Sequence, residues 1–579
     1  MNDNRNMLLA ILLSIIVLVG WSFASERFFP TAADETVTVQ DGEVVDVPGP
    51  SDVGVDPGPD SAEALRDYAE VVAEGQRVAI ETPSLTGSLN LAGARFDDLK
   101  LTRHTEDLNR DEPIHLLTPR GVENAYFAQF GWAGDGVELP GADTVWQADG
   151  TRLTPQTPVT LRWSNGSGQT FFQTISVDED YLFSVRQRVE NRGSGAIAVR
   201  PYALASRAEQ PESLGLWTVH VGPMGVFDRA AEYDVGYKDL DKAGNAGERF
   251  TSEGGWLGFT DKYWLTALVP DQDADIEARM VRGPTGAYQT DYLARPTILQ
   301  PGQASNFDAR FYAGAKEKGV LDAYDAAGIP LLSKAIDWGW FEWFMRPMFD
   351  LLRFLFKWTG NFGVAIILLT VLVRGVMYPI ANKQFRSMAG MRRVQPKLKA
   401  LQERYKDDKP KLQQEMLKLY QAEKINPIAG CLPLLLQIPI FYALYKVLLV
   451  SVEMRHQPFA LWLQDLSAPD PLTPVNLFGL LPFTPPSFLA IGILPILLGI
   501  TMYLQFKLNP APMDETQKTI FSIMPWILMF VMAPFAAGLQ LYWVTSNILT
   551  IAQQKFLYWR YDLEKEGMGE AAHPAKHGA

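Results

Sequence analysis

Cysteine is almost absent from this chain of 579 residues, which contains only Cys431. A single cysteine excludes an intramolecular disulfide framework, so a large domain exported to an oxidising space has to fold on its hydrophobic core alone. Histidine is also scarce, and the six histidines do not have the spacing of a metal site. The sequence contains neither a Walker lysine loop nor a dinucleotide-binding fingerprint. We therefore expect no metal, no cofactor and no ATP-driven step.

The length and the distribution of apolar residues divide the chain into unlike parts. A single hydrophobic core stops growing at roughly 250 to 300 residues, so a chain of this length has to contain several parts. Its mean hydropathy is that of a soluble protein, but apolar residues concentrate at the N-terminus and beyond about Phe344. This segregation predicts that about half of the protein is embedded in a membrane.

The first apolar run, Met7 to Ala24, has 18 residues and no charge. This length is close to the roughly 20 residues that cross a bilayer as a helix. The alternative is a cleaved signal peptide, because Ser22-Phe23-Ala24 resembles a cleavage site and Arg5 supplies a small positive region. The uncharged run is longer than a signal core, and Trp21 suits a membrane interface, so we assign 1–24 to an N-terminal anchor.

The next two parts differ in composition and in periodicity. Residues 25–75 are rich in Pro, Gly, Asp and Glu without sustained periodicity, which predicts an acidic flexible linker. Residues 76–320 contain short alternating runs separated by turn signals such as Asn165-Gly166. No helical periods intervene, so we expect one large all-β sandwich of antiparallel strands.

The β domain has no recognisable catalytic chemistry. Its histidines, His104, His115 and His220, are scattered, and it contains no nucleophile elbow. The aromatic residues between Trp256 and Trp264 are typical of a sheet core rather than a ligand box. A sugar-processing enzyme would need clustered acid and base residues, and none is visible in the sequence. We therefore expect a protein that is not an enzyme and has no catalytic residues.

Aromatic rings are dense between residues 331 and 349. This segment includes Trp338, Trp340 and Trp343 among charged residues such as Lys334. Aromatic rings favour the headgroup level of a bilayer. The segment therefore predicts an amphipathic helix on the outer leaflet, with a buried domain helix as the alternative.

The C-terminal half contains several long runs without charge. Residues 519–554 are too many for a single span, and Pro534 and Gly538 interrupt them, which predicts a hairpin of two short spans. The only charge between Trp358 and Asn382 is that of Arg374. The expected parts are a second span at 350–382, a loop at 383–424, a third span at 425–445, a loop at 446–485, a fourth span at 486–506, a loop at 507–518, the fifth and sixth spans at 519–557 and a tail at 558–579.

The loops set the expected orientation of these spans. Residues 383–424 contain 12 basic and 5 acidic residues, whereas residues 26–350 contain 28 basic and 51 acidic residues. By the positive-inside rule the loop faces the cytoplasm and the β domain faces the periplasm. Six spans with both termini in the cytoplasm satisfy this arrangement. Apolar residues that step by three and four from Val394 to Tyr405 and from Leu412 to Leu419 predict a helical hairpin in the loop.

Polar residues inside the spans are the candidate site. The uncharged stretches of the five C-terminal spans contain no acidic residue that could act as a counter-ion for Arg374. A central arginine normally faces a wet cavity or a partner. The alternative is snorkelling toward the cytoplasmic end of the span. Thr370 lies one turn before Arg374 on the same helix face. Further polar positions are Gln437, Thr501 and Gln505, and a stripe in the last span formed by Gln540, Trp543, Asn547, Thr550 and Gln554.

One motif in the membrane half is highly specific. The run from Asn426 to Phe441, NPIAGCLPLLLQIPIF, resembles the signature of the YidC family of membrane insertases. The arginine in Leu372-Val373-Arg374 and the stretch from Gly538 to Asn547 match the same family in order and spacing. The β domain, with Gly254-Gly255-Trp256 and Phe311-Tyr312-Ala313-Gly314, resembles the Gram-negative branch. The resemblance covers the chain except for the linker and the tail, and it implies a β-supersandwich.

The resemblance implies a function and a set of partners. It implies an inner-membrane insertase and chaperone that works alone or with the Sec translocon through a hydrophilic groove. Nascent membrane proteins would be its substrates, membrane lipids would surround it, and the hairpin would meet ribosomes or signal-recognition targeting factors, without sequence-specific nucleic-acid binding. Residues that match groove positions are Arg374, Thr370, Tyr542 and Trp543, with Gln437 as a weaker match. Gln540 and Asn547, from the polar stripe of the last span, complete the expected groove. The tail is not strongly basic, unlike some relatives, so tail-mediated ribosome binding is not expected.

A secondary transporter that binds an anionic solute through Arg374 is the rival from another class. Transporters usually contain paired repeats with discontinuous helices at the midplane. The five unequal C-terminal spans show no such internal symmetry, so we favour the insertase.

Overall fold

The computed structural model describes residues 65–106, 108, 112–211, 219–405, 408–423, 432–478, 480–481, 490–508 and 515–571. The expected N-terminal anchor at 1–24 lies outside these residues, as do residues 25–64 of the linker and 426–431 of the insertase-like motif. All of the described residues belong to one compact unit.

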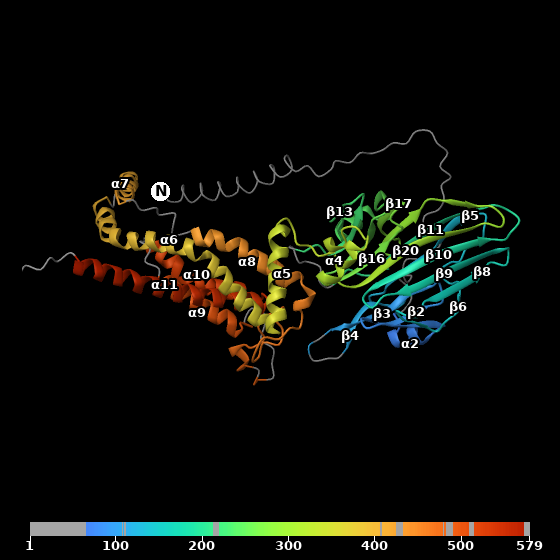
Figure 1. Cartoon of the computed structure of the whole chain (residues 1–579), viewed down its shortest axis with the longest axis horizontal. Coiled ribbons are helices and arrows are strands. Elements are labelled where there is room, and N and C mark those ends of the chain that lie inside the picture. The colour runs from blue at the N-terminus through green and yellow to red at the C-terminus, as the bar shows by residue number, and fades with distance from the viewer. Residues whose placement is uncertain are drawn as a thin grey trace, which may run out of the picture. The chain divides into compact units, whose positions relative to one another are not determined.

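The β domain consists of two sheets that share one hydrophobic core (Figure 1). In the eleven-stranded sheet the order is β14-β17-β18-β11-β5-β3-β2-β1-β7, with β19 paired to β11 and β4 paired to β3. Its strands are β1 (Arg77–Glu81), β2 (Leu85–Asn90), β3 (Arg95–Thr105), β4 (Pro113–Leu117), β5 (Tyr126–Asp135), β7 (Arg152–Leu153), β11 (Ile197–Arg207), β14 (Glu248–Glu253), β17 (Asp275–Arg282), β18 (Tyr288–Ala294) and β19 (Thr297–Leu299).

The nine-stranded sheet has the order β13-β12-β15-β16-β20-β10-β9-β8-β6. Its strands are β6 (Gln147–Ala148), β8 (Val159–Ser164), β9 (Gln169–Val177), β10 (Leu182–Asn191), β12 (Gly222–Phe227), β13 (Ala230–Glu232), β15 (Trp256–Thr260), β16 (Trp264–Val269) and β20 (Ala304–Ala315). Burial alternates along β9, so that Phe171 and Ile175 enter the core while their neighbours do not. The expectation of a large β domain is confirmed, and its strands pair antiparallel except for β1 and β7, which are parallel.

Gly254 and Gly255 form a turn that only glycine accommodates easily. Both have positive φ angles, 66° and 87°, and a Cβ atom on Gly255 would lie 2.0 Å from the carbonyl oxygen of Val226. The turn leads into Trp256, which is buried and donates a hydrogen bond from Nε1 to the carbonyl oxygen of Pro330 at 2.9 Å. The Gly-Gly-Trp motif therefore fixes β15 against the segment by which the chain leaves the β domain.

Short helices flank the β domain, and one of them corrects an expectation. Residues 25–75 were expected to be a flexible linker throughout, but α2 (Tyr68–Ala73) lies in its last part. The side chain of Asp67 caps this helix by accepting hydrogen bonds from the backbone amides of Ala69 and Glu70. The other short helices are α3 (Tyr237–Ala243), α4 (Lys318–Ala326), η1 (Leu332–Ala335), η3 (Val452–Met454) and η4 (Pro474–Asn476).

The aromatic helix lies later in the chain than the sequence suggested. Instead of 331–349, helix α5 covers Glu342–Thr359, and residues before it form η1 and a loop. Gly360, in the left-handed region with φ 69°, ends α5. The side chain of the next residue, Asn361, caps the N-terminus of the helix that begins at Phe362. Residues 350–359, expected in the second span, therefore belong to α5. One face of α5 is buried, whereas Trp343, Phe354 and Trp358 are exposed, so a wholly buried helix is excluded.

The remaining helices are α6 (Phe362–Arg404), α7 (Lys409–Ala422), α8 (Leu432–Val450), α9 (Ile493–Leu508), α10 (Glu515–Met532) and α11 (Ala537–Ala571). Within the described residues, one helical segment, 362–382, is long and apolar enough to cross a membrane. Shorter apolar helical segments lie at 437–450, 493–508 and 522–532.

Two features of these helices concern the expected hairpins. The break between α10 and α11 contains Pro534, where the sequence predicted it. Helix α6, by contrast, continues without interruption from the apolar segment into the first helix of the expected loop hairpin, although Pro379 and Pro396 lie inside it. Helix α7 forms the second arm, and Lys397 on α6 makes an ion pair with Glu423 at 2.6 Å. Helix α11 extends to Ala571, so most of the expected tail is helical.

Candidate functional site

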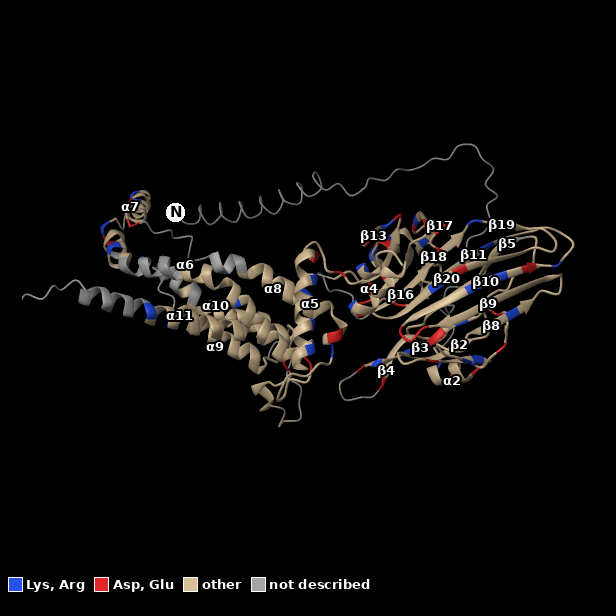
Figure 2. Ribbon diagram, viewed as in Figure 1, with Lys and Arg blue, Asp and Glu red and all other residues tan. Residues whose placement is uncertain are grey.

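Arg374 lies in the apolar part of α6 and meets a hydroxyl group rather than a carboxylate. Its Nε donates a hydrogen bond to Oγ of Ser546 on α11 at 3.1 Å, and its Nη2 donates to the same oxygen. The side chain is half-buried, and no carboxylate lies within ion-pairing distance in the part of the chain that the structure describes. Figure 2 shows few charged residues on the described parts of α8, α9 and the start of α11, whereas charged residues are spread over the β domain. The guanidinium therefore keeps donors and a positive charge that no carboxylate among the described residues neutralises.

Two further residues extend this polar contact to α8. Tyr542 lies one turn before Ser546 on α11, and its hydroxyl accepts a hydrogen bond from Nε2 of Gln437. The Oε1 atom of Gln437 is buried and has no hydrogen-bond partner among the described residues. Trp543 contributes its ring beside that of Phe441, with the two centroids 4.8 Å apart. The expected residues Arg374, Gln437, Tyr542 and Trp543 thus lie where α6, α8 and α11 meet.

A second polar contact joins α11 to α9. Asn547 is buried and donates from Nδ2 to Oγ1 of Thr501 at 3.1 Å. Toward the C-terminal ends of the same helices, Oε1 of Gln505 and Oε1 of Gln554 are buried without hydrogen-bond partners in the described chain. An unsatisfied buried polar group costs about 1 to 3 kcal/mol, so these amides favour water or the polar groups of a substrate beside them.

Two expected site residues have structural roles in this conformation. Thr370 is buried, and its hydroxyl donates to the carbonyl oxygen of Ile366 in its own helix at 2.6 Å. Gln540 is buried, and its Nε2 donates to the carbonyl oxygens of Met532 and Phe535, both at 2.8 Å. Gln540 therefore holds the turn between α10 and α11 by satisfying carbonyls at the end of a helix.

The sequence did not identify Ser546, although it is the direct partner of Arg374. The signal that could have found it is the spacing on α11, because Tyr542, Ser546 and Thr550 follow one another at steps of one turn. Lys446 was also missed. It is buried at the end of α8 and binds Asp337 through the carbonyl oxygen at 2.9 Å and through Oδ2 at 3.1 Å.

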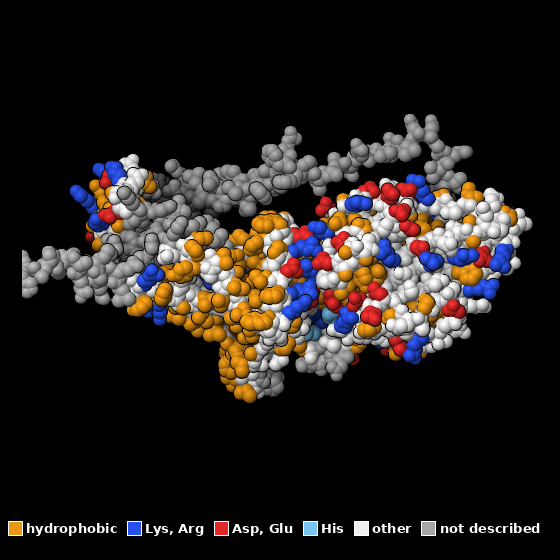
Figure 3. All heavy atoms as spheres, viewed as in Figure 1, with side chains coloured by type: hydrophobic (Ala, Val, Ile, Leu, Met, Phe, Trp, Pro, Cys, Tyr) orange, Lys and Arg blue, Asp and Glu red, His pale blue; other side chains and the backbone are white. Residues whose placement is uncertain are grey.

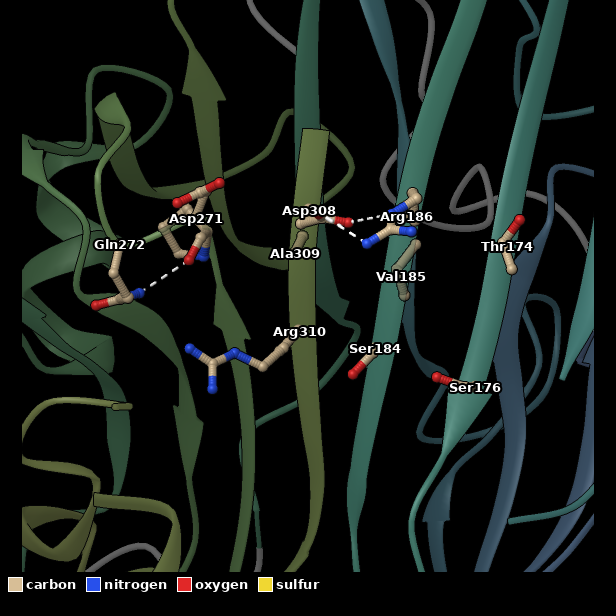
Figure 4. Close-up of a pocket in the computed structure, with 11 residues that line it drawn as sticks. Thr174, Ser176, Ser184, Val185, Arg186, Asp271, Gln272, Asp308, Ala309 and Arg310 are labelled. Carbon is tan, nitrogen blue, oxygen red and sulfur yellow. Dashed lines mark hydrogen bonds and ion pairs between the residues drawn. The ribbon is translucent and has the colours of Figure 1, made fainter. Parts of the chain in front are cut away.

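The β domain contains a polar cavity of about 430 Å³ on its nine-stranded sheet (Figure 4). Hydroxyl groups of Ser176 and Ser184 lie on neighbouring strands, and Arg310 follows on the next strand. The carboxylate of Asp308 is held by Arg186, with Nε to Oδ1 at 2.6 Å. A carboxylate neutralised by an arginine is poorly placed as a general base, so Asp308 is better suited to recognition of a polar group than to acid–base chemistry.

A buried lysine, Lys316, directly follows the last residue of β20. Lys316 donates from Nζ to Oγ1 of Thr260 at 3.0 Å and to the carbonyl oxygens of Asp261 and Ala335 at 2.5 and 3.2 Å. Burial disfavours the charged form and lowers the pKa of Lys316 to about 7, against the opposing influence of nearby Asp261 and Asp337. This lysine joins the β domain to the segment before α5. The free energy of unfolding of the β domain therefore depends on pH through the charge of Lys316.

A β domain followed by apolar helices, with an arginine in α6 that pairs with no described carboxylate, is typical of an integral membrane protein with a polar site among its helices. Residues 77–351 match the family model described as the YidC periplasmic domain, and residues 354–565 match that of the 60Kd inner membrane protein. The chain belongs to the YidC family of membrane protein insertases, which are inner-membrane proteins and not enzymes.

Full-length relatives carry the same description. The membrane protein insertase YidC of Zymomonas mobilis is 45% identical over 583 residues, which cover 100% of this chain and 99% of the relative. That of Bradyrhizobium diazoefficiens is 42% identical and covers 98% of each chain. The crystal structure of an active YidC insertase with its first transmembrane domain resolved is 19% identical, with a TM-score of 0.35, and covers 83% of this chain and 95% of that one.

Proposed function

We propose that this protein inserts client membrane proteins, and helps them fold, through a hydrophilic groove between α6, α8, α9 and α11. The groove would open to the cytoplasm and to lipid, with Arg374, Gln437, Tyr542, Trp543 and Asn547 along it and Thr370 and Gln540 packed behind. The observation that carries the proposal is Arg374, a half-buried cation whose hydrogen-bond partner among the described residues is the hydroxyl of Ser546. Such an arrangement suits a transient anionic or polar guest.

The physical task of the groove is to shorten the dry path across the bilayer. A polar tail that crosses about 30 Å of hydrocarbon loses its hydration, which is strongly unfavourable. Water and amide groups in the inner half of the membrane would replace part of that hydration, while Arg374 attracts acidic residues of the tail. The apolar segment of the client supplies the driving force when it partitions into lipid.

The proposed topology has six spans, with both termini in the cytoplasm and the β domain in the periplasm. The basic excess of residues 383–424 and the acidic excess of residues 26–350 support this orientation. Helix α5, with Trp343, Phe354 and Trp358 exposed, would lie on the outer leaflet. The α6–α7 hairpin would receive ribosomes or targeting factors, and the protein would act alone or beside the Sec translocon.

Site-specific crosslinking tests the groove directly. A photo-reactive amino acid in place of Trp543 should trap a small client during insertion, because Trp543 lies beside Phe441 where α8 and α11 meet. The matched control is Ile548 on the same helix, whose side chain is 52% exposed on the outside of the group of helices. Crosslinks to the client of equal strength from both positions would contradict a groove at Trp543.

Depletion tests the function as a whole. Removal of the protein, followed by proteomics of the inner membrane, should reduce the abundance of small membrane proteins with translocated polar tails. Reconstitution in liposomes distinguishes the insertase from the rival secondary transporter. Solute flux without insertion of a small phage-coat-like protein would support the transporter.

A further inference from the structure

Several hydrogen bonds anchor the first part of the segment between α8 and α9. We call this part, residues 459–470, the base of the segment. The carboxylate of Asp470 is buried and accepts three hydrogen bonds, from Nε1 of Trp462 at 2.9 Å and from the backbone amides of Leu472 at 3.1 Å and Leu494 at 2.8 Å. A carboxylate with three donors is well satisfied without a cation. Asp470 therefore fixes both ends of the segment that follows it.

The same base is tied to the helices that contain the candidate site. The amide of Gly538 at the start of α11 donates to the carbonyl oxygen of Leu466 at 2.9 Å. At the start of α6, Nδ2 of Asn361 donates to the carbonyl oxygen of Phe459 at 2.7 Å. The segment therefore leaves the group of helices at the end where α6 and α11 begin, which is also the end at which α5 joins α6.

Beyond the base, the segment presents large apolar side chains to the outside. We call residues 475–478 with 480–481 the apolar tip. Leu480 is 82% exposed, and Leu477 and Phe478 are 52% and 51% exposed. Soluble surfaces rarely gather so many exposed apolar residues at one place without a partner.

The backbone of the apolar tip holds these side chains in a defined direction. Leu477 and Phe478 have left-handed φ angles of 51° and 62°, which non-glycine residues adopt at a cost. The amide of Phe478 donates to the carbonyl oxygen of Thr473 at 3.0 Å, and that of Leu481 to Asn476 at 3.1 Å. These two left-handed residues and the turn hydrogen bonds beside them fix the direction in which the side chains point.

The sequence around the tip identifies the kind of partner. No Asp, Glu, Lys or Arg occurs from Pro471 to Phe506, so Asp470 is the last charge before α9 and Lys507 the next. Figure 3 shows hydrophobic side chains continuing from the helices onto a protrusion, where Figure 1 draws the segment between α8 and α9. Figure 1 also shows α5 lying across the direction of α6 and α8 at this end. An uncharged apolar projection beside an amphipathic helix suits a lipid surface.

We propose that the apolar tip is a second lipid anchor, which enters the boundary between headgroups and acyl chains of the outer leaflet. This inference rests on the proposed topology, in which this end of the helices faces the periplasm. Together with α5, the apolar tip would fix how deeply the helices sit in the bilayer, because both would be held in the outer leaflet. A client segment, another protein or a second copy of this chain are the occupants that the experiment has to exclude.

The test places a fluorescent probe on the tip in proteoliposomes of phosphatidylethanolamine and phosphatidylglycerol. The chain makes this simple, since Cys431→Ser removes its only cysteine. Leu480→Cys is then labelled with an environment-sensitive dye, and quenching is measured with nitroxide lipids and with aqueous iodide. Two controls use the same background, Val376→Cys at an 80% exposed position of α6 and Ile298→Cys at a 66% exposed position of β19.

We expect the probe at Leu480 to lose most of its emission to nitroxides near the headgroups, and to be protected from iodide. Val376 should be quenched by nitroxides deep in the acyl chains, and Ile298 only by iodide. Iodide quenching at Leu480 equal to that at Ile298 would overturn the proposal. Protection from both quenchers would overturn it as well, because protein then covers the tip. Absence of lipid quenching at Val376 would instead refute the proposed topology.

Discussion

Replacement of Arg374 separates capture of acidic clients from simple hydration of the groove. Arg374→Ala removes the charge, Arg374→Lys keeps it on a flexible stem, and Ser546→Ala removes only the hydroxyl that holds the guanidinium. If the positive charge attracts acidic tails, the alanine variant should fail most for clients with acidic tails and least for clients with neutral tails. Lysine at 374 and alanine at 546 should both retain insertion of acidic tails.

The magnitude follows from Coulomb's law. A carboxylate about 4 Å from the guanidinium gains on the order of 1 to 4 kcal/mol, for effective dielectric constants between those of water and of a protein surface. A tenfold change in insertion needs only about 1.4 kcal/mol, so the loss is measurable. Ser546→Ala leaves the guanidinium without its partner, which should lower the free energy of unfolding by about 1 to 3 kcal/mol while the charge remains.

The assay is insertion into proteoliposomes of paired clients that differ only in the charge of the translocated tail. Proteoliposomes with equal amounts of each variant correct for differences in stability. Equal loss for acidic and neutral tails in Arg374→Ala would refute charge capture and would leave Arg374 as a hydrating or structural residue. A Lys variant as inactive as the Ala variant would show instead that the planar guanidinium, and not the charge, is required.

Four further predictions concern other parts of the chain. Deletion of most of residues 77–320, with α5 retained, should still complement depletion, since the β domain carries no recognisable insertion chemistry; loss of insertion with the truncated protein present would contradict this. Shortening the hairpin between Val394 and Tyr420 should reduce insertion without lowering abundance, and unchanged insertion would indicate a merely solvated loop. Between pH about 7 and 10.5, Lys316 binds a proton in the unfolded chain but not in the folded domain, so the free energy of unfolding should rise with pH across this window. Thermal unfolding of Lys316→Met should show a smaller rise than the unchanged protein, and an equal rise would contradict the assignment. Gly255→Ala should destabilise the β domain by about 2 kcal/mol or more in the same measurement, because its Cβ would meet a carbonyl oxygen; an unchanged melting temperature would contradict the assigned strain.

Much of the fold follows from local chemistry in the sequence. Alternation of apolar residues gave the β strands, and Pro534 marked the break between α10 and α11 because it cannot continue a helix hydrogen-bond ladder. The boundary at Gly360 was missed, since hydrophobicity is similar on both sides and the turn depends on the left-handed backbone of one glycine. The continuity of α6 was also missed, because the change from apolar to basic composition at residue 383 suggested a break that the backbone does not have.

Local sequence patterns also predicted part of the candidate site, but not all of it. Polarity in an apolar segment identifies residues that need partners, and Arg374, Gln437 and Asn547 do have partners on other helices. Periodicity does not distinguish a side chain that serves its own helix or turn from one that faces a groove. Thr370 and Gln540 belong to the first kind, because backbone carbonyls accept their hydrogen bonds.

The two prolines inside α6 mark the points at which this long helix can bend most easily. The helix has 43 residues, or about 65 Å at 1.5 Å per residue, and Arg374 lies before both prolines. Pro379 cannot donate to the carbonyl of Gly375, and Pro396 cannot donate to that of Arg392, so bending costs least at these two points. Any bending at these two points would lie after Arg374. In the proposed topology, the α6–α7 hairpin could then move with a ribosome or client while the arginine keeps its contact with α11.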